Sequence, residues 1–408
     1  MQPKRASPPV TIPEPTASHA TALTGTYPAS RSRLATTAAS IYITNLNSRI
    51  ETIADIVAAN PDSIQQATLA TLLYYRYRIV GKIEDAERAL VAATRAVVTH
   101  PTNRRARHVR ATILSGMHLF EEALSDLERA READFADQRL APLRREIMLA
   151  LGHYDEVPEL DRPSMHAASG FHHAVLLGNL ELMKGRVDLA SARFLEAQQL
   201  YADSSPFQLA WLYTQQGIAL LRSGNCPVAE RFFQAALARM PMYYVAAEHL
   251  AECERAMGQL DSARRRYLSI IEQTDNPEFI GALAELEREA GNQETADKLT
   301  ARAEEGWNEL LARHPQAFTD HAAKFFIASG DARRALALSY SNMENRNDVL
   351  SLLLHASANF EAERLSNACR ALRQAIATGM RPPEILEFEE RFASCDAQLS
   401  MTASENRS

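Results

Sequence analysis

Histidine is the residue type in this chain best suited to metal chemistry. Twelve histidines occur, and the tightest group is His166, His172 and His173. Adjacent residues on a helix point about 100° apart, so His172 and His173 cannot easily chelate one ion together. His314 and His321 are separated by Pro315, which begins a new helix between them. We therefore predict no metal site and expect the histidines to have packing or surface roles.

The four cysteines are the next candidates for redox or metal chemistry. Cys226, Cys253, Cys369 and Cys395 are separated by 27, 116 and 26 residues, which gives no Cys-x-x-Cys pair and no dense framework. This spacing is typical of buried free thiols in a reducing cytosol. We predict four free cysteines and a cytoplasmic protein.

Common catalytic motifs are absent from the sequence. It contains no Gly-x-x-x-x-Gly-Lys-Ser/Thr phosphate loop, no His-Glu-x-x-His pair and no Gly-x-Ser-x-Gly elbow. Within the acidic stretch from Glu278 to Glu309, Glu287 and Glu289 are two residues apart. Side chains at that spacing face apart on a helix, so they form no general acid and base pair. We predict a protein that is not an enzyme and needs no cofactor.

Composition restricts the scaffold that could position a site. The chain has 408 residues, of which 46% are hydrophobic and 23% charged, as in soluble globular proteins. No run approaches the 18 apolar residues of a membrane span, and the first residues lack the apolar core of a secretory signal. The net charge of −7 argues against a chain that tracks phosphate backbones. Only five of 44 basic residues are lysine, which indicates a GC-rich bacterium.

A repeated phrase runs through most of the chain. Each copy has a turn residue followed five positions later by an anchor residue, almost always alanine, as in Gly224 and Ala229. The anchors stand at 86, 123, 157, 190, 229, 263, 296, 335 and 368, so they are 33 to 39 residues apart. Such a period predicts a repeat architecture.

Each repeat has the residues of a helical hairpin. Glycine allows the chain to reverse, and alanine allows two helices to cross closely. Four and seven residues after the anchor the same helical face continues, as in Phe233 and Ala236. Prolines then follow several hairpins: Pro101, Pro241, Pro277 and Pro315. We expect each of these prolines in the first turn of the next helix.

The phrase resembles the tetratricopeptide repeat. The best match reads Ala174-Leu177-Gly178-Gly185-Ala190-Phe194-Ala197. The resemblance covers residues 67 to about 380 and implies an all-α fold, a right-handed superhelical solenoid of stacked helical hairpins with a concave groove lined by first helices. Val157 and Pro158 depart from the pattern, so the third unit should be degenerate, and the ninth unit lacks its turn glycine.

The sequence is therefore divided into five segments. Residues 1–31 are predicted to be a disordered Pro/Ser/Thr-rich tail, and 32–66 an N-terminal capping helix region. Residues 67–381 form the solenoid of about eight to nine units. Residues 382–399 are predicted to form a C-terminal capping helix, and 400–408 a second disordered tail.

The repeat frame points seven side chains into the groove: Tyr75, Arg78, Arg105, His172, Asn179, Trp211 and Arg222. They make its first half basic and aromatic, whereas its second half is more acidic. The carboxylate clamp of some relatives is not matched, because Val175 stands where its lysine would be. Such a surface suits a peptide or helix with uneven charge, with Trp211 and Tyr75 as anchors.

The leading hypothesis is thus a non-catalytic scaffold or adaptor that binds a protein segment in its groove. One alternative is a metal-binding accessory protein or helical-repeat enzyme, and another is a regulatory adaptor in transcription or secretion. We expect a protein or peptide partner, no nucleic acid and no membrane insertion.

Overall fold

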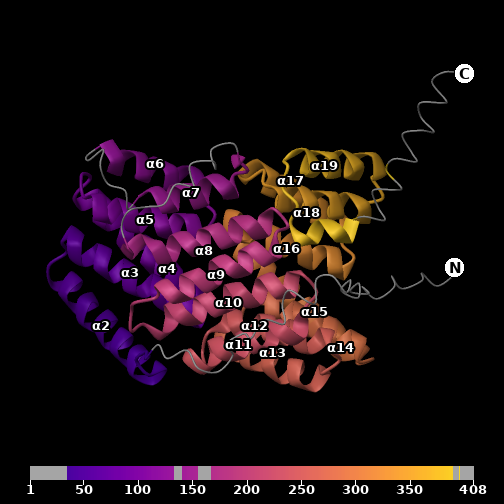
Figure 1. Ribbon diagram of the computed structural model, residues 1–408, viewed down its shortest axis with the longest axis horizontal. Helices are drawn as coiled ribbons and strands as arrows, with labels where there is room; N and C mark the ends of the chain where they lie inside the picture. Colours follow the sequence, from indigo (N-terminus) through magenta and orange to yellow (C-terminus); the bar gives the residue numbers. More distant parts are fainter. Residues whose placement is uncertain (1–34, 133–139, 155–166, 389–394, 396–408) are drawn as a thin grey trace, which may run out of the picture.

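The computed structural model describes residues 35–132, 140–154, 167–388 and Cys395 (Figure 1). These residues form helices joined by turns, and no strand occurs among them. The α-helices, in chain order, are α2 (Ala39–Ala59), α3 (Ser63–Val80), α4 (Ile83–Thr99), α5 (Arg104–Gly116), α6 (Phe120–Glu132), α7 (Ala141–Ala150), α8 (Ala167–Met183), α9 (Val187–Leu200), α10 (Pro206–Arg222), α11 (Cys226–Arg239), α12 (Tyr244–Ala256), α13 (Leu260–Thr274), α14 (Pro277–Glu289), α15 (Gln293–Arg313), α16 (Pro315–Ser329), α17 (Ala332–Asn345), α18 (Val349–Glu361) and α19 (Leu365–Ala377).

Consecutive helices pack in pairs, which confirms the predicted all-α solenoid of stacked hairpins. The pairs begin with α3–α4 and α5–α6, and run from α8–α9 to α18–α19. Helix α7 is the first helix of the predicted degenerate unit, and the segment expected to form its second helix lies outside the described residues. Helix α2 precedes the first pair and packs against α3.

The turn residue of each repeat has left-handed backbone. All seven turn glycines have positive φ, from 74° at Gly185 to 85° at Gly330. Where the sequence lacks glycine, His118 and Glu363 take the same conformation, with φ of 58° and 57°. The ninth unit therefore keeps the turn geometry of the others without its glycine.

Small residues determine how closely the paired helices approach. Ala190, Ala229 and Ala263 are fully buried, as predicted for the anchor position. A Cβ built on Gly217 would lie 2.4 Å from the ring of Phe233, and the same pairing joins Gly178 to Phe194. In these two hairpins, glycine on the first helix therefore makes room for the phenylalanine four residues after the anchor.

The predicted positions of the prolines are half right. Pro277 and Pro315 begin α14 and α16 as expected. Pro101 and Pro241 instead lie in turns, and the next helices begin three residues later at Arg104 and Tyr244. These turns end with N-cap residues: Asn103 accepts a hydrogen bond from the backbone N–H of Ala106, so α5 begins at a side-chain cap and not at the proline.

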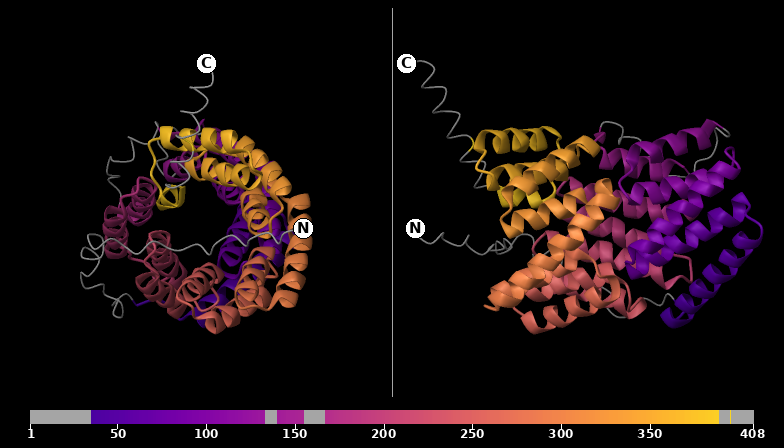
Figure 2. Two further views of the ribbon diagram at one scale, coloured as in Figure 1. Left: turned by 90° about the vertical axis from the view of Figure 1, so that its right-hand side faces the viewer. Right: turned by 180° about the vertical axis from the view of Figure 1, so that it is seen from behind.

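The solenoid turns far enough to meet itself, and seen end-on the helices form a ring (Figure 2). Residues roughly 200 positions apart are bonded across this contact. The Gln273 side-chain amide donates to the Val80 carbonyl at 2.8 Å, and that of Asn345 donates to the His118 carbonyl at 3.0 Å. The Tyr154 hydroxyl accepts from the backbone N–H of Val349 at 2.8 Å. The expected groove is thus the inside of a superhelix with touching turns.

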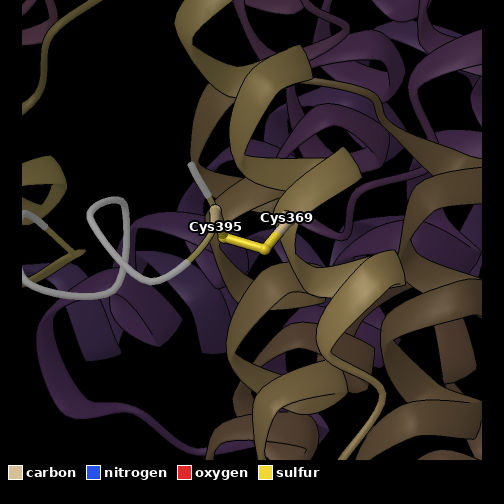
Figure 3. Close-up of a disulfide and its surroundings, with 2 residues drawn as sticks. All are labelled: Cys369 and Cys395. Carbon is tan, nitrogen blue, oxygen red and sulfur yellow. A yellow bond between two sulfur atoms is a disulfide. The ribbon is translucent and has the colours of Figure 1, made fainter. Parts of the chain in front are cut away.

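The C-terminal region corrects one prediction and leaves another untested. A 3₁₀ helix, η3 (Pro383–Phe388), begins the segment 382–399 that is predicted to form a capping helix, and the rest of that segment, apart from Cys395, lies outside the described residues. Cys369 on α19 forms a disulfide with Cys395, so only Cys226 and Cys253 are free thiols, both buried (Figure 3). A separation of 26 residues carries no motif, which is why the pair was missed. The predicted tails 1–31 and 400–408 lie outside the described residues. Among the residues that the structure describes, none of the helices combines the length and the apolar composition that a membrane span requires.

Candidate ligand-binding site

An arginine surrounded by aromatic rings lies where the first superhelical turn meets the second. The guanidinium carbon of Arg78, on α3, is 5.3 Å from the ring centre of Phe207 and 5.8 Å from that of Trp211, both on α10. Tyr75 meets the Phe207 ring edge-on, with centres 6.4 Å apart. His172 on α8 is 6.2 Å from Trp211. We call these five residues the aromatic–arginine cluster.

The cluster is open enough for a ligand to reach. Tyr75, Arg78 and Trp211 are half-buried, and His172 is exposed. Although part of its surface is accessible, the surrounding side chains partly desolvate the His172 ring, and this effect, together with the Arg78 charge, lowers the pKa of His172 below its ordinary value. Arg78 supplies the positive charge of the cluster.

The charge of Arg78 is not neutralised locally. No carboxylate of the described residues forms an ion pair with its guanidinium, whose contacts are the Phe207 and Trp211 rings. Glu146 on α7 interacts with it electrostatically but forms no ion pair with it. A half-buried cation without an anion is costly, so an anionic ligand group there would be stabilised.

The structure brings together four of the seven predicted groove residues, Tyr75, Arg78, His172 and Trp211. Arg105 is exposed in the first turn of α5, and Asn179 is half-buried on α8; neither belongs to the cluster. Arg222 corrects the prediction. Its guanidinium forms a two-point ion pair with the carboxylate of Glu384 on η3, with Nη2 and Oε2 2.7 Å apart. This side chain binds the protein's own C-terminal segment.

Carboxylates and imidazoles from three first helices form a second group, which we call the acid–imidazole cluster. On α12, the His249 Nδ1 lies 2.7 Å from a carboxylate oxygen of Glu252. Across α14 and α16, the His321 Nδ1 lies 2.6 Å from a carboxylate oxygen of Glu278. Glu248 completes the cluster through its electrostatic interaction with Glu278.

Mutual repulsion and attraction shift the pKa values within this cluster. Burial and the nearby Glu278 charge raise the pKa of Glu248 to about 8. Burial opposes the charge of His249, but the Glu252 and Glu248 carboxylates outweigh it and raise the pKa to about 9. The pKa of His321 is raised to about 9 in the same way by Glu278 and Asp320, against the effect of burial. The cluster therefore retains protons at neutral pH.

The two clusters are joined by Tyr243. Its ring meets Phe207 edge-on with centres 5.3 Å apart, and its hydroxyl interacts electrostatically with both Arg78 and Glu248. This tyrosine thus lies between the Arg78 cation and the carboxyl groups of the acid–imidazole cluster. The predicted change from a basic and aromatic first half to an acidic second half corresponds to this boundary.

A cavity between the superhelical turns is a weaker candidate than the two clusters, because its arginine side chains already have partners. It has a volume of about 310 Å³ and is bordered by Tyr77, Tyr244, Arg302 and Arg313, among others. The two guanidiniums are already engaged, Arg302 with Asp275 and Arg313 with Glu87. The aromatic–arginine and acid–imidazole clusters are therefore better candidates for ligand binding.

Sequence reasoning missed Phe207, Glu278 and the contribution of His321. Phe207 follows the proline that begins α10, and nothing in its neighbourhood distinguishes it from a core residue. The signal that could have been used is Glu248-His249 followed by Glu252, since spacings of three and four place polar side chains on one helical face.

Comparison with known proteins gives a fold likeness only. No family model matches the chain, and no curated protein matches it. YrrB, described as a TPR protein with an unusual peptide-binding site, is 18% identical over 57% of this chain and 98% of its own, with a TM-score of 0.29. A monomeric mutant of IFIT1 with Gppp-AAAA is 14% identical over 80% and 76%, with a TM-score of 0.49. PilF of Pseudomonas aeruginosa is 15% identical over 62% and 94%, with a TM-score of 0.29.

Proposed function

We propose that this chain is a non-catalytic scaffold that binds a peptide segment of another protein on the inner surface of its superhelix. The observation that carries the proposal is the guanidinium of Arg78, which lies over the Phe207 and Trp211 rings without an ion-pair partner among the described residues. A carboxylate of the peptide would pair with this cation, and an apolar side chain would pack on Trp211.

The adjacent acid–imidazole cluster indicates the rest of the ligand. Glu248 and Glu252 have no arginine or lysine partner in the described structure, so a basic side chain of the peptide would be favoured there. A peptide that carries an acidic and a basic residue would then span the boundary at Tyr243. The second cluster adds selectivity, because a purely acidic peptide would be repelled by it.

The test is a synthetic peptide library in which one acidic and one basic residue are placed at varied spacing. Binding of the full chain is measured by fluorescence anisotropy. We expect selected peptides to contain both charges, and Arg78→Gln to weaken their binding about tenfold or more. Arg95→Gln is the matched control, because it removes an exposed arginine of the second helix α4, outside both clusters and outside the predicted groove, and should leave affinity unchanged.

Several outcomes would contradict this function. Equal binding by the wild type and Arg78→Gln, with unchanged melting temperature, would show that the guanidinium is not used. Tighter binding of poly(U) RNA than of any peptide would favour a nucleic acid partner. Failure of the wild type to bind any member of the library would also count against it.

A further inference from the structure

A second kind of ligand would fit the part of the acid–imidazole cluster on α12, where it would take the place that the peptide proposal gives to a basic side chain. Glu248, His249 and Glu252 each offer one ligand atom, and these atoms all lie within 4.8 Å of one another. We propose that they bind one divalent transition metal ion of the zinc type. The three residues stand at positions i, i+1 and i+4 of one helix. Adjacent residues point about 100° apart, but the long glutamate side chain of Glu248 brings its carboxylate within 4.8 Å of the other two ligand atoms.

The donor set favours zinc over magnesium or calcium. It comprises one imidazole nitrogen and two carboxylate oxygens, whereas magnesium and calcium sites in proteins use oxygen ligands. Neighbouring ligands around zinc are roughly 3.3 Å apart, since each bond is about 2.0–2.1 Å long. The His249 and Glu252 atoms are already 2.7 Å apart, so a small opening of this contact would admit the ion.

The imidazole ring of His249 is held in place by an aromatic neighbour. The His249 ring lies against the fully buried Phe233 ring of α11, with centres 5.7 Å apart. This contact fixes the side of the ring that faces the carboxylates. His249 and Glu252 keep 21% and 42% of their side-chain surface exposed, so an ion can enter from solvent. Three protein ligands would leave at least one position for water or for a ligand group.

No arginine or lysine of the described residues pairs with these carboxylates. Glu248 forms no ion pair in the described structure, and the ion-pair partner of Glu252 is His249. One turn further along α12 the situation differs, because Arg255 pairs with both Glu285 and Glu289, at 2.9 and 2.5 Å. A metal ion that displaced the His249 proton could therefore be bound by Glu248 and Glu252 without competing with an arginine or lysine.

Isothermal titration of chelator-treated full-length protein with zinc chloride tests the proposal. We expect one equivalent of zinc to bind, and magnesium chloride to bind at least tenfold more weakly. His249→Gln and Glu252→Gln should each weaken zinc binding tenfold or more. Glu289→Gln is the matched control. Glu289 lies on the neighbouring helix α14 and is already paired with Arg255, so its loss should not change zinc binding.

The two buried thiols are an alternative zinc site, which the experiment has to distinguish from the carboxylates. Cys226 and Cys253 interact with each other and electrostatically with Glu252, so thiolates could capture zinc in place of the carboxylates. Zinc binding that disappears in Cys226→Ser/Cys253→Ala but persists in Glu252→Gln would overturn the proposal. So would the absence of stoichiometric binding by the wild type, or equal affinity for magnesium.

Folding and peptide binding are separated from metal binding by two further measurements. If His249→Gln lowers the helical signal, Glu252→Gln, whose side chain is more exposed, decides the outcome alone. Arg78→Gln should retain full zinc affinity, because it lies in the other cluster. Failure of the peptide proposal would thus leave the zinc result intact, and failure of zinc binding would leave the peptide result intact.

Discussion

Arg222 and Glu384 are 162 residues apart in sequence, and their side chains form a two-point ion pair that fixes η3 against α10. The backbone N–H of Arg381 also donates to the Met183 carbonyl at 2.9 Å, so the C-terminal segment is tied to two first helices of earlier units. A residue expected to recognise a partner is thereby used to close the superhelix.

Glu384→Gln should loosen this closure without unfolding the chain. The pair is partly exposed, with 21% and 30% of the side-chain surfaces accessible, so its loss should cost at most about 1 kcal/mol of stability. Chymotrypsin should nevertheless cleave faster after Leu386 in η3, which can be followed by mass spectrometry. Glu361→Gln, an exposed glutamate on α18 without an ion pair, is the control. Identical cleavage of all three proteins would count against the contact.

Gly217→Ala should destabilise the chain, although alanine is the better helix former. The added methyl group would lie 2.4 Å from the Phe233 ring, closer than any real contact allows. Either the helices separate or the ring moves, and we expect a loss of about 1–3 kcal/mol in urea unfolding. Gly217→Ala/Phe233→Leu should regain part of this loss, because leucine leaves room for the methyl group. A stabilised single variant would show that the helix crossing is looser than described.

Acid should destabilise the protein through His118. Burial lowers the pKa of this histidine to about 4, against the raising effect of the Asp320 charge and with a smaller lowering effect from Arg346 and His321. In the unfolded chain its pKa is about 6.5. The resulting stability is therefore present above pH 6.5 and is lost as the pH falls through 4, by about 1–3 kcal/mol.

Comparison of urea unfolding at pH 7 and pH 4.5 isolates this effect. His118→Asn keeps a residue that tolerates positive φ but cannot take up the proton, so its stability should fall less on acidification than that of the wild type. His321, whose pKa is raised to about 9, adds stability as the pH falls towards 6.5, but it does so in both proteins, so the comparison with His118→Asn cancels its contribution. His100→Asn, at an exposed position, is the control. Equal acid sensitivity of wild type and His118→Asn would be inconsistent with the buried imidazole.

Thiol titration checks the cysteine pairing. In denaturant without reductant, two thiols should react in the wild type, Cys226 and Cys253, because Cys369 and Cys395 are joined. Cys395→Ser should lower the stability by about 3 kcal/mol under oxidising conditions, since the disulfide closes a loop of 26 residues. In dithiothreitol the two proteins should melt alike. Four reactive thiols in the wild type would restore the prediction of free cysteines.

The repeat frame could be predicted because its causes are local. Turn glycines and anchor alanines are set by the geometry of one hairpin, so the positions hold even at His118 and Glu363, where glycine is missing. The contacts of Arg222, Gln273 and Asn345 could not be predicted in the same way. They join units that are neighbours only because of the pitch of the superhelix, and pitch accumulates from small rotations that no single repeat displays.

The residues of the candidate site likewise fall into those whose positions follow from the repeat frame and those that depend on contacts between superhelical turns. Tyr75, Arg78 and Trp211 could be placed on inward faces from the repeat frame, since each lies at a fixed offset within its own unit. That Arg78 lies on the Phe207 ring depends on two units that the frame does not relate. Glu248, His249 and Glu252 lie within about one helical turn. Their proximity could therefore be predicted from the spacing between histidine and glutamate, although not from the spacing between histidines.

Contact between successive turns changes how a repeat protein should unfold. In an open array each unit touches its immediate neighbours, so terminal units fray and partly folded states accumulate. Here Glu87 of the first hairpin holds Arg313 and His314, more than 220 positions later, and α2 is tied to the middle of the chain through the Thr37 N–H and the Ser204 carbonyl. Opening an end would therefore disrupt units far along the sequence. We expect one cooperative transition, and slow folding, because these closures have high contact order.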